Sequence, residues 1–305
     1  MHNSEESLNH IKKKYLKFLK SQEVVSEPFR DKLGQLNNFF LPISKKIYRN
    51  YLHGKQTKII GLAGGQGSGK STISQILKII LKEVFNLNIV IFSIDDFYKT
   101  FQERKIMSKK IDPLFLTRGV PGTHCTSLLL KCLKNLKSKN FQKFSIPKFD
   151  KSIDDRLPKK FWQNIKTKPD IVIFEGWCVG ASPQTNKDLI KPINILEKEK
   201  DKNRTWRNFV NKELKNRYKK IFKLIDLMIF LKIPSFEYVY KWRLLQEKKL
   251  KVTSKGKKTM SNKQVKNFIM FYERITKHML KNFSKKAKFI INIDSSHRLK
   301  SIKFN

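Results

Sequence analysis

Five short runs of apolar residues predict buried β-strands along the chain. These runs are Lys58–Ala63, Ile89–Ile94, Asp170–Phe174, Leu224–Ile233 and Phe289–Ile293. None alternates between apolar and polar residues, so we expect both faces of each strand to be buried. Between most of these runs, apolar residues at helical spacing predict helices, notably at Thr126–Leu136, Arg204–Phe222, Phe236–Leu250 and Asn262–Asn282. Strands of this kind separated by helices are typical of a parallel sheet with helices on both faces.

The first part of the chain predicts a helical extension over residues 1–52. Apolar residues recur there at helical spacing, at Leu8, Ile11, Tyr15 and Leu19. A second helical segment is expected from about Pro28 to Tyr51, with a break near Pro42. Residues 53–305 then form the main domain, with elements for a substrate and a lid at about 98–165 and 235–262. Within the second of these, Val252–Lys258 is the predicted mobile loop.

Composition narrows the possible functions. The formal net charge is +41, but 55 of the 66 basic residues are lysines spread along the whole chain. A nucleic-acid surface more often clusters arginine with aromatic residues. We therefore expect no dedicated nucleic-acid partner, and keep a nucleic-acid-binding protein that uses ATP as a switch as an alternative.

The chain lacks the sequence features of a membrane or secreted protein. No apolar run is long enough to span a membrane, and Met1–His10 lacks the features of a secretory signal. Cys125, Cys132 and Cys178 are widely spaced and form no CxxC pair. A disulfide framework or zinc site is therefore not expected, and we predict a reducing, cytoplasmic location.

A glycine-rich turn follows the first predicted strand and matches GxxxxGK[ST]. It is followed by a predicted helix, Gly69–Val84. Glycines allow backbone N–H groups to surround phosphate oxygens, and the helix N-terminus favours the same anion. We expect Lys70 to reach the β- and γ-phosphates of ATP and Ser71 to bind Mg²⁺. The predicted ATP-binding residues are Gly64, Gly65, Gln66, Gly67, Ser68, Gly69, Lys70, Ser71 and Thr72. The alternative is a glycine-rich turn without a ligand.

Acidic residues follow two other predicted strands. Asp95 and Asp96 come after Ile89–Ile94, and Glu175 follows Asp170–Phe174. Ligands of open parallel sheets bind beyond the carboxyl ends of the strands, so these carboxylates should lie near the γ-phosphate. Asp95 is the predicted catalytic base, with Asp96 as second choice, and Glu175 is a predicted metal ligand beside Ser71. The alternative is that Asp95 and Asp96 only cap the next helix.

Several polar segments are candidates for binding the acceptor and the transferred phosphate. The predicted substrate-binding residues are Tyr98, Arg118, His124, Lys148, Asp150, Arg156 and Trp177. Among them, Arg118, Lys148 and Arg156 are suited to a carboxylate or phosphate. His124 can instead be a hydrogen-bonded turn residue, and Trp177 can be core packing. Arg243, on the predicted helix Phe236–Leu250, is a candidate lid cation for ATP unless that helix is only amphipathic surface.

The ordered motifs resemble one kinase family. The P-loop is followed by SIDDFY, RGVPGTH, PKFDKS, FEGW and KWRLLQEKKL, then MSNKQVKNFIMFYERITKH. Over about residues 40–285 this series resembles D-glycerate 3-kinases of the plant and cyanobacterial type and their bacterial relatives. That group belongs with phosphoribulokinase, uridine kinase and pantothenate kinase. One position departs, since Cys125 stands where relatives commonly have Asp.

The resemblance implies a fold and a reaction. It implies an α/β P-loop kinase core with a five-stranded parallel sheet in the order 2-3-1-4-5. It also implies ATP- and Mg²⁺-dependent phosphorylation of D-glycerate to 3-phosphoglycerate, with Asp95 as base. In a phototroph this reaction would serve photorespiration. Two alternatives remain open: a kinase for a nucleoside, pantothenate or a sugar phosphate, and a catalytically silent relative.

Overall fold

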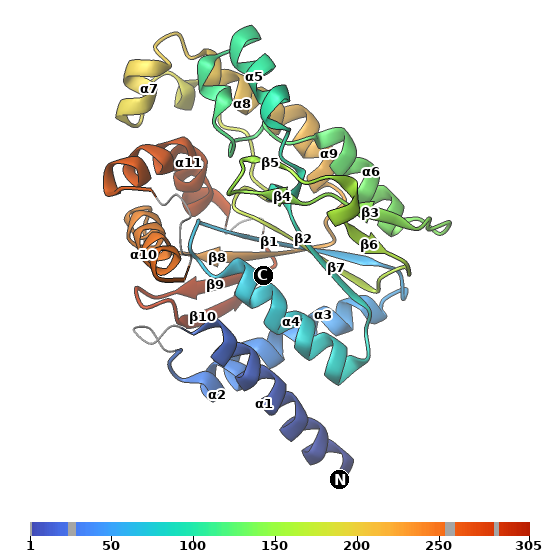
Figure 1. The fold of residues 1–305 in the computed structure, drawn as a ribbon. Helices are drawn as coiled ribbons and strands as arrows, with labels where there is room; N and C mark the ends of the chain where they lie inside the picture. The colour runs from blue at the N-terminus through green and yellow to red at the C-terminus, as the bar shows by residue number, and fades with distance from the viewer. Residues whose placement is uncertain (1, 24–28, 254–259, 284–286) are drawn as a thin grey trace.

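A six-stranded sheet forms the centre of the protein (Figure 1). The computed structural model describes residues 2–23, 29–253, 260–283 and 287–305. The strand order across the sheet is β10-β9-β8-β1-β7-β2. The strands are β1 (Lys58–Gly64), β2 (Ile89–Ser93), β7 (Ile171–Gly176), β8 (Leu227–Lys232), β9 (Phe289–Ile293) and β10 (Leu299–Phe304).

The observed sheet differs from the expected one at one edge. Each predicted apolar run contains a strand, and these five strands are parallel neighbours in the order β2-β7-β1-β8-β9. The predicted total of five is wrong, because β10 pairs antiparallel with β9 as a sixth strand. Most β10 residues are exposed, so this edge strand lacks the long apolar run that marks the buried strands.

Helices cover both faces of the sheet, as the lack of alternation predicts. Ile60 of β1 faces a layer that contains α1 (His2–Gln22), α3 (Leu41–Leu52) and α4 (Lys70–Phe85). Its neighbour Ile59 faces the opposite layer. The second layer contains α6 (Thr126–Lys137), α9 (Lys219–Phe222) and α11 (Asn262–Asn282).

The N-terminal helices share the hydrophobic core of the first layer. Ile11 and Tyr15 of α1 are buried with residues of α3 and α4. No break occurs at Pro42: α2 (Lys32–Gln35) and a π-helical turn (Leu36–Phe40) run into α3. Pro42 directly follows the π-helical turn, so the hydrogen bond that proline cannot donate falls where the regular α-helical pattern is already interrupted.

The long segments between the sheet strands contain short helices and strands that the sequence pattern does not define. They include α5 (Phe101–Lys110), α7 (Ile195–Lys200) and two small antiparallel ladders. The ladders pair β3 (Phe144–Ile146) with β6 (Gln163–Ile165), and β4 (Phe149–Asp150) with β5 (Asp155–Arg156). The ladders were not predicted, since strands of two or three residues carry no readable period. The helix α5 was not predicted either, and the one residue that it buries is Arg104, so it has no apolar face.

Two predicted segments differ in detail from the observed helices. The expected helix Arg204–Phe222 comprises α8 (Thr205–Glu213), a π-helical turn (Leu214–Tyr218) and α9. The helix expected at Phe236–Leu250 is α10 (Glu237–Thr253). The loop predicted at Val252–Lys258 falls mainly on residues 254–259, which lie outside the described residues. Within the described chain, we find no helix with the length and apolar character needed to cross a membrane.

Candidate active site

The P-loop joins β1 to α4 at the carboxyl edge of the sheet. Gly67 and Gly69 have φ of 78° and 81°, the left-handed region that glycine adopts at low cost. The Lys70 Nζ atom donates hydrogen bonds to the carbonyl oxygens of Gly64 and Gly65, at 3.0 Å each. Burial lowers the pKa of Lys70, while the nearby Glu175 and Asp95 carboxylates act in the opposite direction. The turn therefore places an ammonium group and a helix N-terminus at one concave surface.

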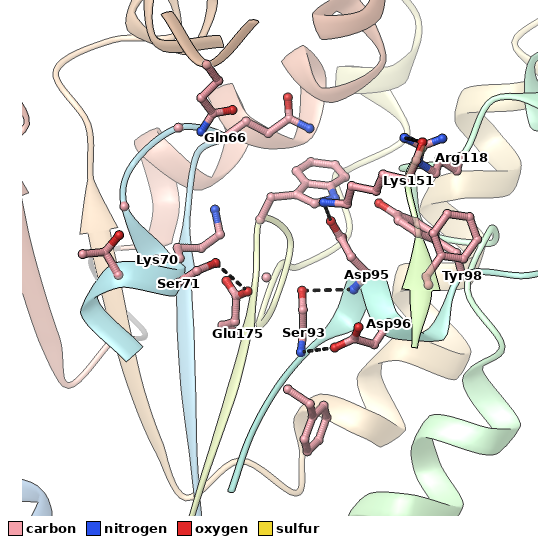
Figure 2. Close-up of a pocket in the computed structure, with 18 of the residues that line it drawn as sticks. Gln66, Lys70, Ser71, Ser93, Asp95, Asp96, Tyr98, Arg118, Lys151 and Glu175 are labelled. Carbon is pink, nitrogen blue, oxygen red and sulfur yellow. Dashed lines mark hydrogen bonds and ion pairs between the residues drawn. The ribbon is translucent and has the colours of Figure 1, made fainter. Parts of the chain in front are cut away.

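Ser71 and Glu175 form a second polar group beside the P-loop. The Ser71 hydroxyl donates to Glu175 Oε1 at 3.1 Å (Figure 2), and Glu175 is buried near the carboxyl end of β7. Burial raises the pKa of Glu175, and the Lys70 ammonium opposes this rise. Among the described residues, no three His, Cys, Asp or Glu side chains lie close enough together to hold a metal. The hard oxygen donors of Ser71 and Glu175 fit Mg²⁺, which usually takes one or two carboxylates together with water and phosphate oxygens.

Asp95 and Asp96 have different surroundings, although they are adjacent in sequence. Both lie in a 3-10 turn, Ile94–Phe97, that follows β2. Asp96 Oδ2 accepts from the Ser93 backbone N–H at 3.0 Å, as part of a capping box. Burial raises the pKa of Asp96, and Lys148, whose Nζ lies 3.2 Å from Asp96 Oδ1, opposes this rise. The capping role therefore belongs to Asp96.

Asp95 points into the cavity instead. Its Oδ2 atom accepts from Lys151 Nζ at 2.7 Å. Its Oδ1 atom is buried, and the Tyr98 hydroxyl also interacts with this carboxylate. Burial alone would raise the pKa of Asp95, but Lys151, with smaller effects of His124 and Tyr98, outweighs burial, and the pKa falls to about 2. Asp95 is thus an ionised carboxylate at neutral pH that lines the cavity.

One cavity of about 480 Å³ connects these groups. Lys70, Ser71 and Glu175 lie on one side of it, and Asp95 and Lys151 lie on the other (Figure 2). The predicted site residues that line it are Gln66, Gly67, Gly69, Lys70, Ser71, Thr72, Asp95, Asp96, Tyr98, Arg118, Lys148, Glu175, Trp177 and Arg243. This volume lies within the range of about 300–1,000 Å³ that is usual for small-molecule sites.

Six predicted site residues do not line this cavity. The Gly64 and Gly65 carbonyls serve Lys70, and Ser68 lies on the other side of the P-loop. His124 is buried, stacks on Tyr98 at 4.4 Å and contacts the Tyr218 hydroxyl through Nδ1. Burial also lowers the pKa of His124 to about 4. These buried contacts fit a hydrogen-bonded turn residue better than a residue that binds the acceptor.

Asp150 and Arg156 complete these six residues. Asp150 Oδ1 accepts from the backbone N–H and the hydroxyl of Ser152. Arg156 donates to the Tyr98 carbonyl at 2.7 Å. Both side chains therefore support the chain around Tyr98 and the β4–β5 turn. The departure noted at Cys125 also lies outside the cavity lining.

The structure adds cavity residues that the sequence did not single out. Lys151 contacts the predicted base, and Tyr272 of α11 packs edge-on against Trp177 at 4.8 Å. The other unpredicted lining residues are Gln75, Ile91, Phe92, Ser93, Phe149, Gly176, Gln246 and Phe268. Lys151 lies in the PKFDKS motif, which marked this segment as a candidate for acceptor binding but did not single out the Lys151 side chain.

Three comparisons with known proteins agree with this geometry. The family model for the phosphoribulokinase/uridine kinase family matches residues 59–185. The chain is 35% identical to an uncharacterized kinase of Schizosaccharomyces pombe over 70% of this chain and 78% of that protein. It is 29% identical to the chloroplastic D-glycerate 3-kinase of Arabidopsis thaliana over 79% of this chain and 56% of that protein.

A solved structure shows the same fold. The D-glycerate 3-kinase of Cryptococcus neoformans superposes with a TM-score of 0.73 at 24% identity, over 87% of this chain and 99% of that one. The P-loop, the carboxyl-edge acids and the S. pombe relative lead to one family assignment. The chain belongs to the phosphoribulokinase/uridine kinase family of P-loop kinases.

Proposed function

We propose that this kinase transfers the γ-phosphoryl group of ATP to D-glycerate and forms 3-phosphoglycerate. The observation that carries the proposal is the position of the ionised Asp95 carboxylate across the cavity from Lys70. A water-using ATPase has no need of an acceptor space beside a base. The plant relative and the fungal structure, both named D-glycerate 3-kinases, support the choice of acceptor.

The charge of the acceptor side favours an anionic substrate. Arg118, Lys148 and Lys151 all line the cavity near Asp95. They pair with Asp154, Asp96 and Asp95, respectively. A carboxylate on the acceptor can take up part of this positive charge. Glycerate, with one carboxylate and adjacent hydroxyls, matches this arrangement.

The reaction follows from these positions. The acceptor hydroxyl oxygen attacks the γ-phosphorus, the bond from that phosphorus to the β,γ-bridging oxygen breaks, and ADP leaves. Asp95 Oδ1 accepts the hydroxyl proton as the new bond forms. Lys70 and Arg243 bind the charge that develops on the transferred group. Ser71 and Glu175 would hold Mg²⁺, which neutralises phosphate charge when bound.

Assays of the purified protein with ATP, Mg²⁺ and separate acceptors test this function. We expect acceptor-dependent ADP release with D-glycerate, and 3-phosphoglycerate rather than 2-phosphoglycerate as product. Pantothenate deserves its own assay, since a pantothenate kinase of Streptococcus gordonii is 32% identical over 48% of this chain. Uridine and a sugar phosphate complete the set. Release of ADP with glycerate no faster than with water alone would refute the choice of acceptor.

Replacing Lys151 by Ala should shift the pH dependence of the reaction. Lys151 is the main group that lowers the pKa of Asp95, while burial raises it. Without Lys151 the Asp95 pKa should rise. A base must be deprotonated, so activity is lost as the pH falls through its pKa. The acid limb of kcat/KM should therefore move to higher pH in Lys151→Ala.

The matched control for this experiment is Lys160→Ala. Lys160 is an exposed lysine that does not line the cavity. Its replacement removes the same charge from the chain and should leave the acid limb where it is. An unchanged acid limb in Lys151→Ala would contradict the electrostatic role assigned to Lys151.

A further inference from the structure

The helix α5 buries one side chain, and that side chain is an arginine. Arg104 is fully buried, and neither it nor any other residue of α5 lines the cavity around Asp95. Because arginine stays protonated in proteins, a buried guanidinium group needs hydrogen-bond acceptors and a negative charge close by. In Figure 1, α5 lies outside the sheet, above β4 and β5. The partners of Arg104 therefore show what this helix holds in place.

Arg104 connects three segments on the acceptor side of the cavity. Its Nε donates to the Lys99 carbonyl at 3.3 Å, and its Nη1 donates to the Leu116 carbonyl. Its Nη2 donates to the Asp154 carbonyl at 2.7 Å and lies 3.0 Å from Asp154 Oδ2. One planar group thus fixes the relative positions of the chain after β2, the chain just before Arg118 and the β4–β5 turn.

Asp154 transmits this hold to Arg118, which lines the cavity. The two oxygens of its carboxylate are divided, since Oδ2 pairs with Arg104 and Oδ1 pairs with Arg118. Asp154 also has a φ of 56°, a left-handed conformation that few residues other than glycine adopt. The bond from Arg104 to the Asp154 carbonyl supports this conformation. The carboxylate that meets Arg118 therefore takes its position from Arg104.

Arg118 is held at its backbone and at its side chain. The Tyr272 hydroxyl donates to the Arg118 carbonyl at 3.3 Å. The Arg118 guanidinium group lies over the Phe149 ring, 5.6 Å from its centroid, and Arg104 lies over the same ring at 6.0 Å. The Arg118 side chain still is 20% exposed and lines the cavity on the side of Asp95 (Figure 2). A guanidinium group fixed in this way loses less conformational entropy when it binds a carboxylate.

We propose that Arg104 is a positioning residue for acceptor binding, which acts through Asp154 on the guanidinium group of Arg118. The inference rests on the proposed function, in which Arg118 belongs to the cations that attract the acceptor carboxylate. It gives α5 a role in acceptor affinity, although the helix contributes no residue to the cavity lining. The opposing interpretation is that Arg104 only stabilises the fold.

Replacing Arg104 by Met tests the proposal, with Arg207→Met as the matched control. Arg207 is also buried, pairs with Asp201 at 2.8 Å and donates to the Leu189 carbonyl, but it does not line this cavity. Both variants should unfold at lower urea concentration, because each removes a buried donor group from its acceptors. Only Arg104→Met should raise the KM for D-glycerate, by about tenfold or more, the effect of one hydrogen bond to a charged group. The KM for ATP should stay at the wild-type value in both.

A double variant separates positioning from stability. Arg118→Ala alone should raise the KM for D-glycerate. If Arg104 acts through Arg118, adding Arg104→Met to Arg118→Ala should raise this KM little further, since coupled residues are not additive. If Arg104→Met does not fold, Arg104→Lys takes its place, with Arg207→Lys as control. Lysine keeps the charge but lacks the planar fork that reaches all three segments, so the KM should still rise.

Labelling with phenylglyoxal, a reagent for accessible arginines, tests the same contact without an acceptor. Arg118 should react faster in Arg104→Met than in the wild-type protein, because the turn that holds its partner carboxylate has lost its anchor. In Arg207→Met, Arg118 should react at the wild-type rate. Mass spectrometry of the peptide that contains Arg118 measures the rate.

Four outcomes would overturn the proposal. An unchanged KM for D-glycerate, or an unchanged rate of Arg118 labelling, would leave Arg104 with a role in stability alone. An equal rise in the KM for ATP would indicate general damage to the cavity. A full additional loss in the double variant would show that Arg104 does not act through Arg118.

The choice of acceptor fails separately from this proposal. If D-glycerate is not phosphorylated, the proposed function falls, and the labelling rates still decide whether Arg104 positions Arg118. If D-glycerate is phosphorylated with the wild-type KM in Arg104→Met, the role of Arg104 falls and the proposed function stands.

Discussion

Replacing Asp95 by Asn should lower kcat for phosphoryl transfer by about a hundred- to ten-thousand-fold, the usual contribution of a general base. The amide nearly preserves the shape of the side chain but cannot accept the acceptor proton in the same way. The Asp95 carboxylate is ionised and lines the cavity, so its loss should affect the chemical step. The Kd for ATP should change little, because Lys70 and the P-loop backbone remain. Steady-state kinetics with D-glycerate and calorimetry with ATP measure the two quantities.

Asp96→Asn is the matched control for Asp95. The two acids are neighbours in one turn, but Asp96 caps that turn and pairs with Lys148. Its replacement should lower the free energy of unfolding, and its effect on kcat should be smaller than that of Asp95→Asn. If Asp96→Asn lost as much kcat as expected for Asp95→Asn, while Asp95→Asn kept its turnover, the base would be Asp96.

The parts of this site that the sequence predicted are those with a local backbone cause. Gly67 and Gly69 are needed for positive φ, and Lys70 follows them at the start of a helix. Asp95 and Glu175 lie at the carboxyl ends of buried parallel strands, which meet at one edge of the sheet. In each case the chain geometry near the residue determines where the side chain lies.

The parts that were missed depend on contacts between distant segments. Lys151 reaches Asp95 because the β4–β5 turn folds over the 3-10 turn after β2, and one lysine among 55 gives no signal of this. Arg156 looked like an anion-binding residue, yet it donates to a backbone carbonyl. Sequence alone does not distinguish an arginine that supports the backbone from one that binds a substrate.

The antiparallel strand β10 shows the same limit at the level of the fold. Its residues mix polar and apolar types, and most of them are exposed. Its place is determined by pairing with β9 and by the Gln35 contacts from the N-terminal helices. An edge strand of this kind is recognised only when its partners are in position.

Replacing Arg274 by Met should destabilise the protein by about 3–5 kcal/mol, as expected when one partner of a buried ion pair is removed. Arg274 of α11 donates to both oxygens of Glu197 in α7, at 2.7 and 2.6 Å, and both residues are buried. It also donates to the carbonyls of Asp188 and Lys191. The Met variant leaves a buried carboxylate and two carbonyl oxygens without these donors.

Arg298→Met is the control for that loss, because Arg298 pairs with Asp294 near the surface, and their side chains are 48% and 20% exposed. Exposed pairs of this type contribute about 0–1 kcal/mol, so this variant should unfold at nearly the wild-type denaturant concentration. Urea unfolding followed by circular dichroism measures both variants. If Arg274→Met lost no more free energy of unfolding than the control, the Arg274–Glu197 pair would not stabilise α11, the helix that carries Tyr272 into the cavity.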